Sequence, residues 1–130
     1  MEIPSDIAQP LHILIVDRDA STRKLLQTLF FSQGYTVSCA REPFEALNLV
    51  KPKVPDAIIS SLVFEDMDGF ELCRQLRAMP ETASKLIVAL TGLWSSGIEE
   101  AILSAGFDRY LLKPVNIEFL LSLLDTLNAP

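Results

Sequence analysis

Five short apolar runs, separated by amphipathic segments, most constrain what this chain can fold into. The runs are rich in Ile, Leu and Val and cover residues 11–17, 35–39, 56–61, 85–91 and 108–112. Short apolar runs of this kind suit strands that are buried on both faces of a parallel sheet. The alternation of strand and helix therefore predicts an α/β fold, in which helices cover both faces of a doubly wound, five-stranded parallel sheet.

The segments between the runs carry helix signals. The first helix stops at Gly34, which suits a left-handed C-terminal cap, and the second begins near Pro43, where a missing N–H is harmless. Apolar residues recur at helical spacing and are expected to face the core. They are Leu25, Leu26, Leu29 and Phe30 in the first helix, Leu72, Cys73, Leu76 and Met79 in the third, Ile98, Ala101, Ile102 and Ala105 in the fourth, and Ile117, Leu120, Leu121 and Leu124 in the fifth.

The length of 130 residues fits one domain and leaves no room for an output domain that folds independently. Residues 1–10 are polar and contain two prolines, so we expect a flexible N-terminal tail there and the folded domain over residues 11–128. A chain of this organisation must signal by being bound. We therefore expect it not to be an enzyme.

Acidic side chains outnumber basic ones, 17 to 11, and give a formal charge of −6. This charge disfavours binding to nucleic acid. No apolar run approaches the roughly 20 residues needed to span a bilayer, and the N-terminus lacks signal-peptide features, so we expect a cytoplasmic protein without membrane contact. Cys39 and Cys73 lack metal-binding spacing and are expected to be reduced thiols. His12 lies in an apolar run and is expected to be structural.

Polar residues follow four of the predicted strands. They are Asp17, Arg18 and Asp19 after the first strand, Ser61 after the third, Thr91 after the fourth, and Lys113 with Pro114 after the fifth. In an open parallel sheet the functional crevice lies beyond the carboxyl ends of the strands. Each residue alone has an ordinary explanation, such as helix capping by Asp19, but their joint placement predicts a functional site.

Four stretches of the sequence carry a family resemblance. They are ILIVDRDASTRKLL at 13–26, PDAIISSLVFEDMDGFELCRQLR at 55–77, IVALTG at 87–92 and AGFDRYLLKP at 105–114. From about Leu11 to Leu127 the chain resembles the receiver domains of two-component response regulators. The resemblance implies a flavodoxin-like (βα)5 fold with strand order 2-1-3-4-5.

Receiver domains bind Mg²⁺ through a strand-one acidic pair and a strand-three aspartate, which accepts a phosphoryl group from a histidine kinase. The resemblance implies that Asp17 corresponds to the first acid, Thr91 to the hydroxyl residue and Lys113 to the amine that contact the phosphoryl oxygens. Tyr110 corresponds to the aromatic residue that swings inward. The Lys113–Pro114 peptide corresponds to one that is cis in the family, which an X-Pro bond permits.

Two positions depart from the family at the chemical centre. Ser61 stands where the family has its acceptor aspartate, and Arg18 stands where it usually has its second acid. Asp17 would then face two cations, whereas Mg²⁺ needs hard oxygen ligands. We therefore expect a degenerate phosphorylation pocket with no metal and no cofactor. The guanidinium of Arg18 either takes the place of the metal beside Asp17 or points into solvent.

These departures predict a phosphorylation-independent receiver domain, a pseudo-receiver that acts as a protein-interaction module in two-component signal transduction. One alternative is a working phosphorelay receiver with an unconventional acceptor, which is disfavoured because Ser61 has no neighbouring general base. Another is a flavodoxin-like cofactor binder, which is disfavoured because carboxylates after the first strand would repel a phosphate.

The expected partner is a protein, namely a histidine kinase, an output protein or a second copy of the chain. Phe119 and Leu123 lie one turn apart, away from the predicted core stripe of the last helix, and begin an apolar patch. In the family, the surface of the fourth helix, fifth strand and fifth helix commonly mediates docking. We predict that Phe119 and Leu123, with Tyr110 nearby, form a constitutive docking surface. The alternative is that the N-terminal segment, through Ile3 and Leu11, covers them.

Overall fold

Five strands lie side by side in one parallel sheet, in the order β2-β1-β3-β4-β5, in a computed structural model that describes residues 10–128. The predicted fold class and strand order are confirmed. Each strand begins and ends within one residue of its predicted run, and the strands are β1 (His12–Val16), β2 (Thr36–Ala40), β3 (Ala57–Ser60), β4 (Leu86–Thr91) and β5 (Arg109–Leu112). The predicted tail falls almost entirely on residues 1–9, which lie outside the described residues.

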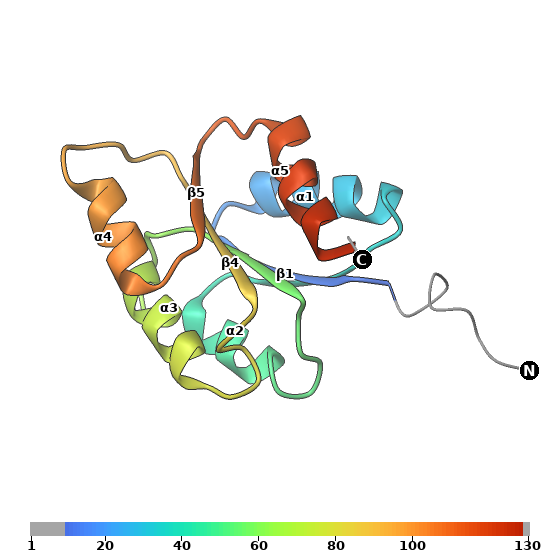
Figure 1. Cartoon of the computed structure of the whole chain (residues 1–130), viewed down its shortest axis with the longest axis horizontal. Helices are drawn as coiled ribbons and strands as arrows, with labels where there is room; N and C mark the ends of the chain where they lie inside the picture. Colours follow the sequence, from blue (N-terminus) through green and yellow to red (C-terminus); the bar gives the residue numbers. More distant parts are fainter. Residues whose placement is uncertain (1–9, 129–130) are drawn as a thin grey trace, which may run out of the picture.

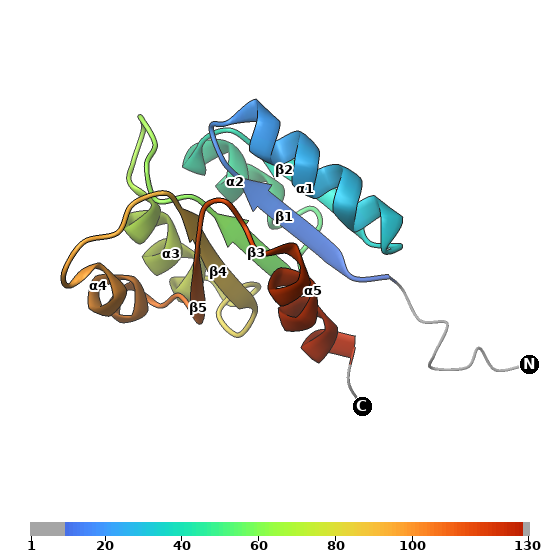
Figure 2. The same ribbon diagram turned by 90° about the horizontal axis from the view of Figure 1, so that it is seen from above.

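Helices cover both faces of the sheet (Figures 1 and 2). Helices α1 and α5 pack on one face, and α2, α3 and α4 pack on the other. The helices are α1 (Ala20–Ser32), α2 (Pro43–Leu49), α3 (Gly69–Ala78), α4 (Ile98–Ala105) and α5 (Ile117–Asp125), and a 3-10 turn follows at Thr126–Asn128. None of the helices in the described part of the chain is long and apolar enough to cross a membrane.

The sheet separates two apolar clusters. Neighbouring residues of a strand point to opposite faces, so Ile58 belongs to the cluster under α2, α3 and α4, whereas Ile59 belongs to the cluster under α1 and α5. Both side chains are at most 1% exposed. The near-continuous apolar runs seen in the sequence therefore serve both faces of the sheet.

Two helix ends are explained by backbone conformation, and the one at Gly34 was predicted from the sequence. Gly34 follows α1 with a φ of 84°, and Gly106 follows α4 with a φ of 116°. L side chains rarely adopt this left-handed region, which glycine enters freely. At Gly106 a Cβ would also meet Cγ of Arg77 at 2.9 Å. Pro43 is the first residue of α2, as predicted.

Several predicted core positions are more exposed than expected. Leu25 is 49% exposed, because only Leu26 and Phe30 of α1 are buried against the sheet. Leu25 instead lines a groove of about 260 Å³ together with Pro114 and Val115. In α4, Ala101 is also exposed, since the buried stripe of this short helix consists of Ile102 and Ala105.

His12 has the structural role that was predicted. It is 5% exposed, and its ring nitrogens lie 2.7 Å from Oγ1 of Thr36 and 2.9 Å from Oγ of Ser38. Burial is the main cause that lowers the pKa of His12, and the nearby Lys53 lowers it further. Cys39 and Cys73 are both free thiols, and burial raises the pKa of Cys73 to about 11.

The edge of the sheet where the strands end and the edge where they begin carry different parts of the chain. The carboxyl ends of all five parallel strands meet at one edge. At the opposite edge β1 begins and α5 ends (Figure 2). There the hydroxyl of Tyr35, just before β2, donates a hydrogen bond of 3.4 Å to Asp125 of α5. The candidate site and the ends of the described chain therefore lie at opposite edges.

Candidate functional site

The parallel register brings the predicted site residues to one edge of the sheet. The backbone N–H of Ser61 donates to the carbonyl of Val16 at 2.9 Å, which places the residue after β3 beside Asp17. The N–H of Lys113 donates to the carbonyl of Thr91 at 2.8 Å, which joins the ends of β4 and β5. Asp17, Ser61, Thr91 and Lys113 therefore lie together at this edge of the sheet, and we call the place where they meet the crevice.

Asp17 is the buried carboxylate of this crevice, and it is 3% exposed. Its Oδ2 lies 3.0 Å from Nζ of Lys113, and its Oδ1 accepts a hydrogen bond of 2.9 Å from the backbone N–H of Asp19. Because both oxygens of the carboxylate accept hydrogen bonds, one of them from an ammonium, the cost of burying its charge is offset. Asp17 and Lys113 therefore form an ion pair at the centre of the site.

Asp19 caps α1. Its Oδ1 accepts from the N–H of Ser21 at 3.0 Å, and its Oδ2 accepts from the hydroxyl of Thr22 at 2.8 Å. The hydrogen bonds from Thr22 and Ser21 are the main causes that lower the pKa of Asp19. This carboxylate is thus committed to the N-terminus of the helix, where a negative charge is also favoured by the helix dipole.

Arg18 occupies neither of the two positions that the sequence suggested. Its guanidinium does not pair with Asp17 and does not stand free in solvent. It donates to Oε1 of Glu65 at 2.7 Å, and its Nε lies 3.5 Å from Oε1 of Glu42. The interpretation that the guanidinium replaces a metal beside Asp17 is wrong, because two carboxylates on neighbouring loops attract it away from the buried pair.

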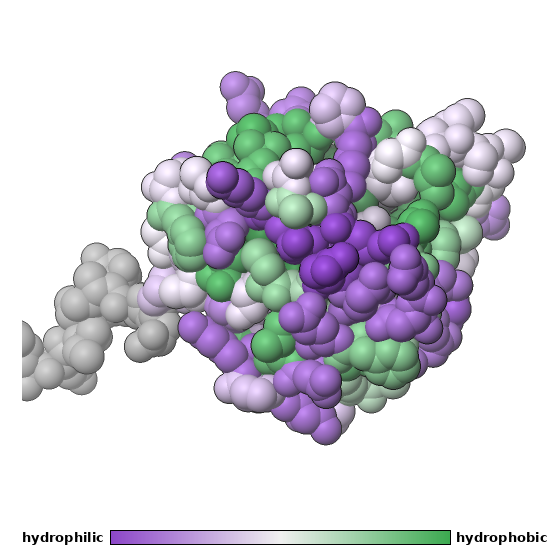
Figure 3. All heavy atoms as spheres, turned by 180° about the vertical axis from the view of Figure 1, so that it is seen from behind, coloured by the Kyte–Doolittle hydropathy of each residue, from purple (hydrophilic) through white to green (hydrophobic). Residues whose placement is uncertain are grey.

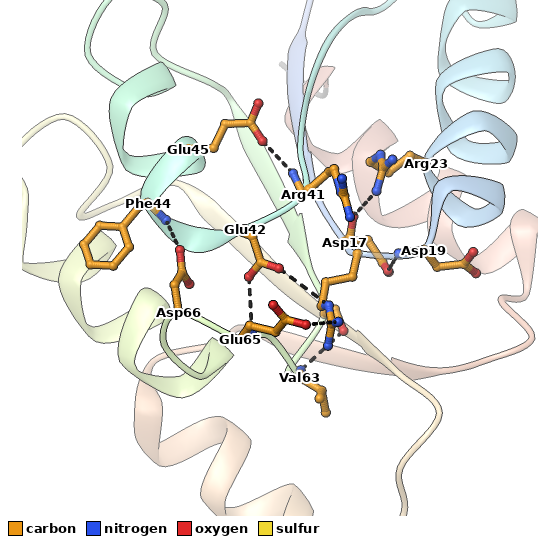
Figure 4. Close-up of polar contacts among 12 residues, drawn as sticks. Asp17, Asp19, Arg23, Arg41, Glu42, Phe44, Glu45, Val63, Glu65 and Asp66 are labelled. Atoms are coloured by element: carbon orange, nitrogen blue, oxygen red, sulfur yellow. Dashed lines mark hydrogen bonds and ion pairs between the residues drawn. The ribbon is translucent and has the colours of Figure 1, made fainter.

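The β3–α3 loop is tied to the start of α2 by these and two further contacts (Figure 4). The N–H of Glu65 donates to Oε2 of Glu42 at 3.2 Å, and the N–H of Phe44 donates to Oδ2 of Asp66 at 3.2 Å. The sequence analysis missed Glu42, Glu65 and Asp66. They lie in two loops about twenty residues apart, and no spacing in the sequence signals their contact.

The hydroxyls of Ser61 and Thr91 each accept a hydrogen bond from the backbone N–H two residues further along the chain. Oγ of Ser61 accepts from the N–H of Val63 at 3.4 Å, and Oγ1 of Thr91 accepts from the N–H of Leu93 at 2.9 Å. Gly69, the first residue of α3, lies so close to Ser61 that an added Cβ would meet the carbonyl of Ser61 and come within 2.7 Å of Cα of Leu62. Helix α3 is therefore packed directly against the residue that follows β3.

The structure shows the Lys113–Pro114 peptide and the environment of Tyr110, two features of the fifth strand and its loop that the sequence analysis singled out. The Lys113–Pro114 peptide is cis, as predicted. Tyr110 is partly buried and packs against the apolar cluster under α4. Partial burial and the neighbouring carboxylate of Glu99 both raise the pKa of Tyr110.

The predicted docking residues differ in exposure. Phe119 is 45% exposed, whereas Leu123 is partly buried and packs against the α1–α5 cluster. Leu123 is therefore partly a core residue, since it lies on the flank of the α5 stripe that contacts the sheet. Leu11 packs against the same cluster, and Ile3 lies outside the described residues.

Exposed apolar residues lie among charged ones over the molecule, as the face drawn in Figure 3 shows. Beside Phe119, the residues Leu103 and Tyr110 line a hollow of about 230 Å³, which joins α4, β5 and α5. Leu112, two residues after Tyr110 in β5, is 42% exposed. We call these four residues, Leu103, Tyr110, Leu112 and Phe119, the α4–β5–α5 surface.

Comparison with known proteins agrees with this architecture. Residues 13–125 match the response regulator receiver domain family, which is most of the chain. The chain belongs to the response regulator receiver domain family.

Relatives of two lengths are similar to the chain. An uncharacterised 14.6 kDa protein of Leptolyngbya boryana is 36% identical over 82% of this chain and 81% of its own length. The response regulator MprA of Mycobacterium sp. (strain KMS) is 38% identical over 87% of this chain but only 48% of its own length, so the chain spans about half of that relative. Among solved structures, the chemotaxis protein CheY4 of Vibrio cholerae has a TM-score of 0.85 and 28% identity, and the match covers 92% of this chain and 99% of that one.

Proposed function

We propose that this receiver domain is not phosphorylated and works as a phosphorylation-independent protein-interaction module in two-component signalling. The observation that carries the proposal is the group that follows β3 in the crevice. It is the hydroxyl of Ser61, which accepts from the N–H of Val63, and not a carboxylate that could form an acyl phosphate.

The chemistry around Ser61 supports the proposal. A serine hydroxyl becomes a nucleophile only when a general base takes its proton, and both oxygens of Asp17 already accept hydrogen bonds. The acids of the following loop have other partners too. Glu65 pairs with Arg18, Asp66 accepts from Phe44, and Asp68 caps α3.

The oxygen donors of the crevice do not fit Mg²⁺. The ion needs several oxygen ligands in near-octahedral geometry. Asp17 is paired with the ammonium of Lys113, and Asp19 caps α1. Within residues 10–128, no three His, Cys, Asp or Glu side chains come together in a group that could hold a metal ion. Binding of Mg²⁺ is therefore not part of the proposed function.

The module is proposed to act by docking to a protein. Receiver domains of two-component systems interact with histidine kinases or output domains, and this chain carries the same fold. Its net charge of −6 disfavours nucleic acid as a partner. We place it in the cytoplasm, where the free thiols Cys39 and Cys73 stay reduced.

A phosphoryl-donor experiment tests the proposal. The purified chain is incubated with acetyl phosphate and Mg²⁺ and its intact mass is measured. We expect no added phosphoryl group, because Ser61 offers no carboxylate. The matched control is the double variant Ser61→Asp with Arg18→Asp, which restores the two missing acids and is expected to gain one phosphoryl group. A phosphorylated wild-type chain would establish the working phosphorelay receiver instead.

A further inference from the structure

We propose that an ionic clamp holds the β3–α3 loop, residues 61–68, against the start of α2, and that loss of its charges releases the loop while the domain stays folded. The clamp consists of Arg18, Glu42, Glu65 and Asp66. The inference goes beyond the proposed function, because it concerns the position of a loop at the crevice and not the group that follows β3.

Two carboxylates of the clamp, those of Glu42 and Asp66, point in opposite directions across the space between the loop and α2 (Figure 4). Glu42 is the N-cap residue of α2, yet its side chain does not cap the helix and accepts instead from the backbone N–H of Glu65 at 3.2 Å. Asp66 of the loop accepts from the N–H of Phe44, in the first turn of α2, at 3.2 Å. The N–H groups at the start of a helix need an acceptor from outside the helix. The loop therefore caps α2, and α2 in turn holds the loop.

Arg18 adds a positive charge from a third loop. Its guanidinium lies 2.7 Å from Oε1 of Glu65 and 3.5 Å from Oε1 of Glu42. Because both carboxylates contact one guanidinium, its removal would leave two like charges close together, and they would repel each other. Glu42 would then hold the N–H of Glu65 less firmly. Arg18 is therefore the residue that positions the loop against α2.

The base of the loop is held by contacts that do not depend on charge. The N–H of Gly69 donates to the carbonyl of Leu62 at 2.9 Å, and Phe64 and Met67 pack against the apolar cluster under α2, α3 and α4. These contacts remain when the ion pairs of the clamp are lost. The expected motion is therefore confined to residues 65–66 and the first turn of α2, and it does not require unfolding of the domain.

The clamp is exposed enough to respond to salt. The side chains of Arg18, Glu42 and Glu65 are 41%, 27% and 74% exposed. Exposed ion pairs are weak, and dissolved salt screens them further. Weak contacts of this kind open and close readily, whereas the buried base of the loop stays in place. We therefore expect the loop to be released more often as the ionic strength rises.

Hydrogen exchange of two amides tests the inference, because the N–H groups of Glu65 and Phe44 both donate to carboxylates of the clamp. Their exchange with water is measured by NMR on the full chain in buffer without Mg²⁺, relative to unstructured peptides of the same sequence. Arg18→Gln should speed exchange at both amides by about three- to tenfold, since two exposed ion pairs are lost. Raising NaCl to about 1 M, where the Debye length is about 3 Å, should speed exchange in the wild type but much less in Arg18→Gln.

Further variants separate the clamp from a general effect of charge. Arg74→Gln also removes one cation and an exposed pair, the one with Glu71 on α3, and it should change exchange at the two amides less than about twofold. Arg18→Glu should speed exchange more than Arg18→Gln, because it places a third carboxylate beside Glu42 and Glu65. Adding Glu65→Arg to Arg18→Glu returns a guanidinium to the group and should restore most of the protection.

Several results would overturn the inference. They are wild-type exchange rates in Arg18→Gln, equal acceleration by Arg74→Gln, or failure of the reciprocal pair of substitutions to restore protection. Faster exchange in strands β1 and β3 as well would show that Arg18 stabilises the whole domain and does not act as part of a clamp. None of these results changes whether the chain accepts a phosphoryl group, so the failure of this inference is distinct from the failure of the proposed function.

Discussion

The guanidinium of Arg18 joins three loops that are far apart in the sequence. It contacts Glu42 before α2 and Glu65 in the β3–α3 loop, while it extends from the loop after β1 itself. Its side chain is 41% exposed, and exposed ion pairs contribute little to the free energy of unfolding. The contacts therefore matter for the position of the loops at the crevice more than for the stability of the fold.

His12 gives the chain a dependence of stability on pH. Its pKa is lowered in the folded protein, so the unfolded chain binds more protons as the pH falls below about 6.5. The stability that the neutral ring contributes is present above that pH and is lost as the pH falls through the folded pKa.

We predict that the free energy of unfolding, measured by urea titration, decreases in that range and that His12→Asn removes the His-dependent part of the decrease. His12 is the single histidine of the chain, which makes the comparison direct. An unchanged pH profile in the variant would show that other groups cause the dependence.

Arg77 of α3 connects three elements of the helical layer. Its guanidinium donates to the carbonyls of Gly106, Ala83 and Lys85 and to the carboxylate of Asp108. The turn after α4 and the loop before β4 are thereby fixed to α3. Asp108 in turn accepts from the N–H of Ile87, so the network reaches strand β4.

Because the hydrogen bonds to the carbonyls of Gly106 and Lys85 are partly buried, we expect Arg77→Met to lower the free energy of unfolding by about 1–3 kcal/mol. Arg74→Met is the matched control, since Arg74 on the same helix forms an exposed pair with Glu71 and no other ion pair within residues 10–128. The control is expected to change stability by less than about 0.5 kcal/mol. Equal losses in both variants, measured by urea titration, would contradict a special role for Arg77.

Helix faces were predicted from the sequence only in part. The stripe formed by Leu72, Cys73 and Leu76 of α3 is buried as predicted. Leu25 and Leu123 were assigned to the wrong environment, because spacing along a helix gives the centre of the buried face but not its width. The width depends on the neighbouring elements, such as the Lys113–Pro114 turn that leaves a groove beside Leu25.

The same distinction holds for the site. Asp17, Thr91 and Lys113 could be placed together from the sequence, because parallel strands deliver their carboxyl ends to one edge. The partners of Arg18 could not be predicted from the sequence, since Glu42 and Glu65 lie in two loops that come together only through the packing of α2 and α3.

At the scale of the whole molecule, the sheet divides the interior into two separate clusters. Ile58 and Ile59 are neighbours in β3, yet their side chains share no cluster. We predict that Ile58→Val and Ile59→Val each lower the free energy of unfolding by about 0.5–1.5 kcal/mol.

The two losses are also expected to add in the double variant to within about 0.5 kcal/mol, because side chains without shared partners act independently. Urea titration of the three variants gives the comparison. A coupling larger than that value would mean that strain passes through the backbone of β3 from one face to the other.

The start of β1 and the end of α5 lie at the edge of the sheet opposite the crevice, where Tyr35 contacts Asp125. Two dyes attached at the ends of the described chain would thus report unfolding as a loss of energy transfer, while the loops at the other edge stay unlabelled. Immobilisation through the same edge would leave the crevice facing the solution. The fold therefore separates the edge of the sheet that is suited to attachment from the edge that carries the crevice.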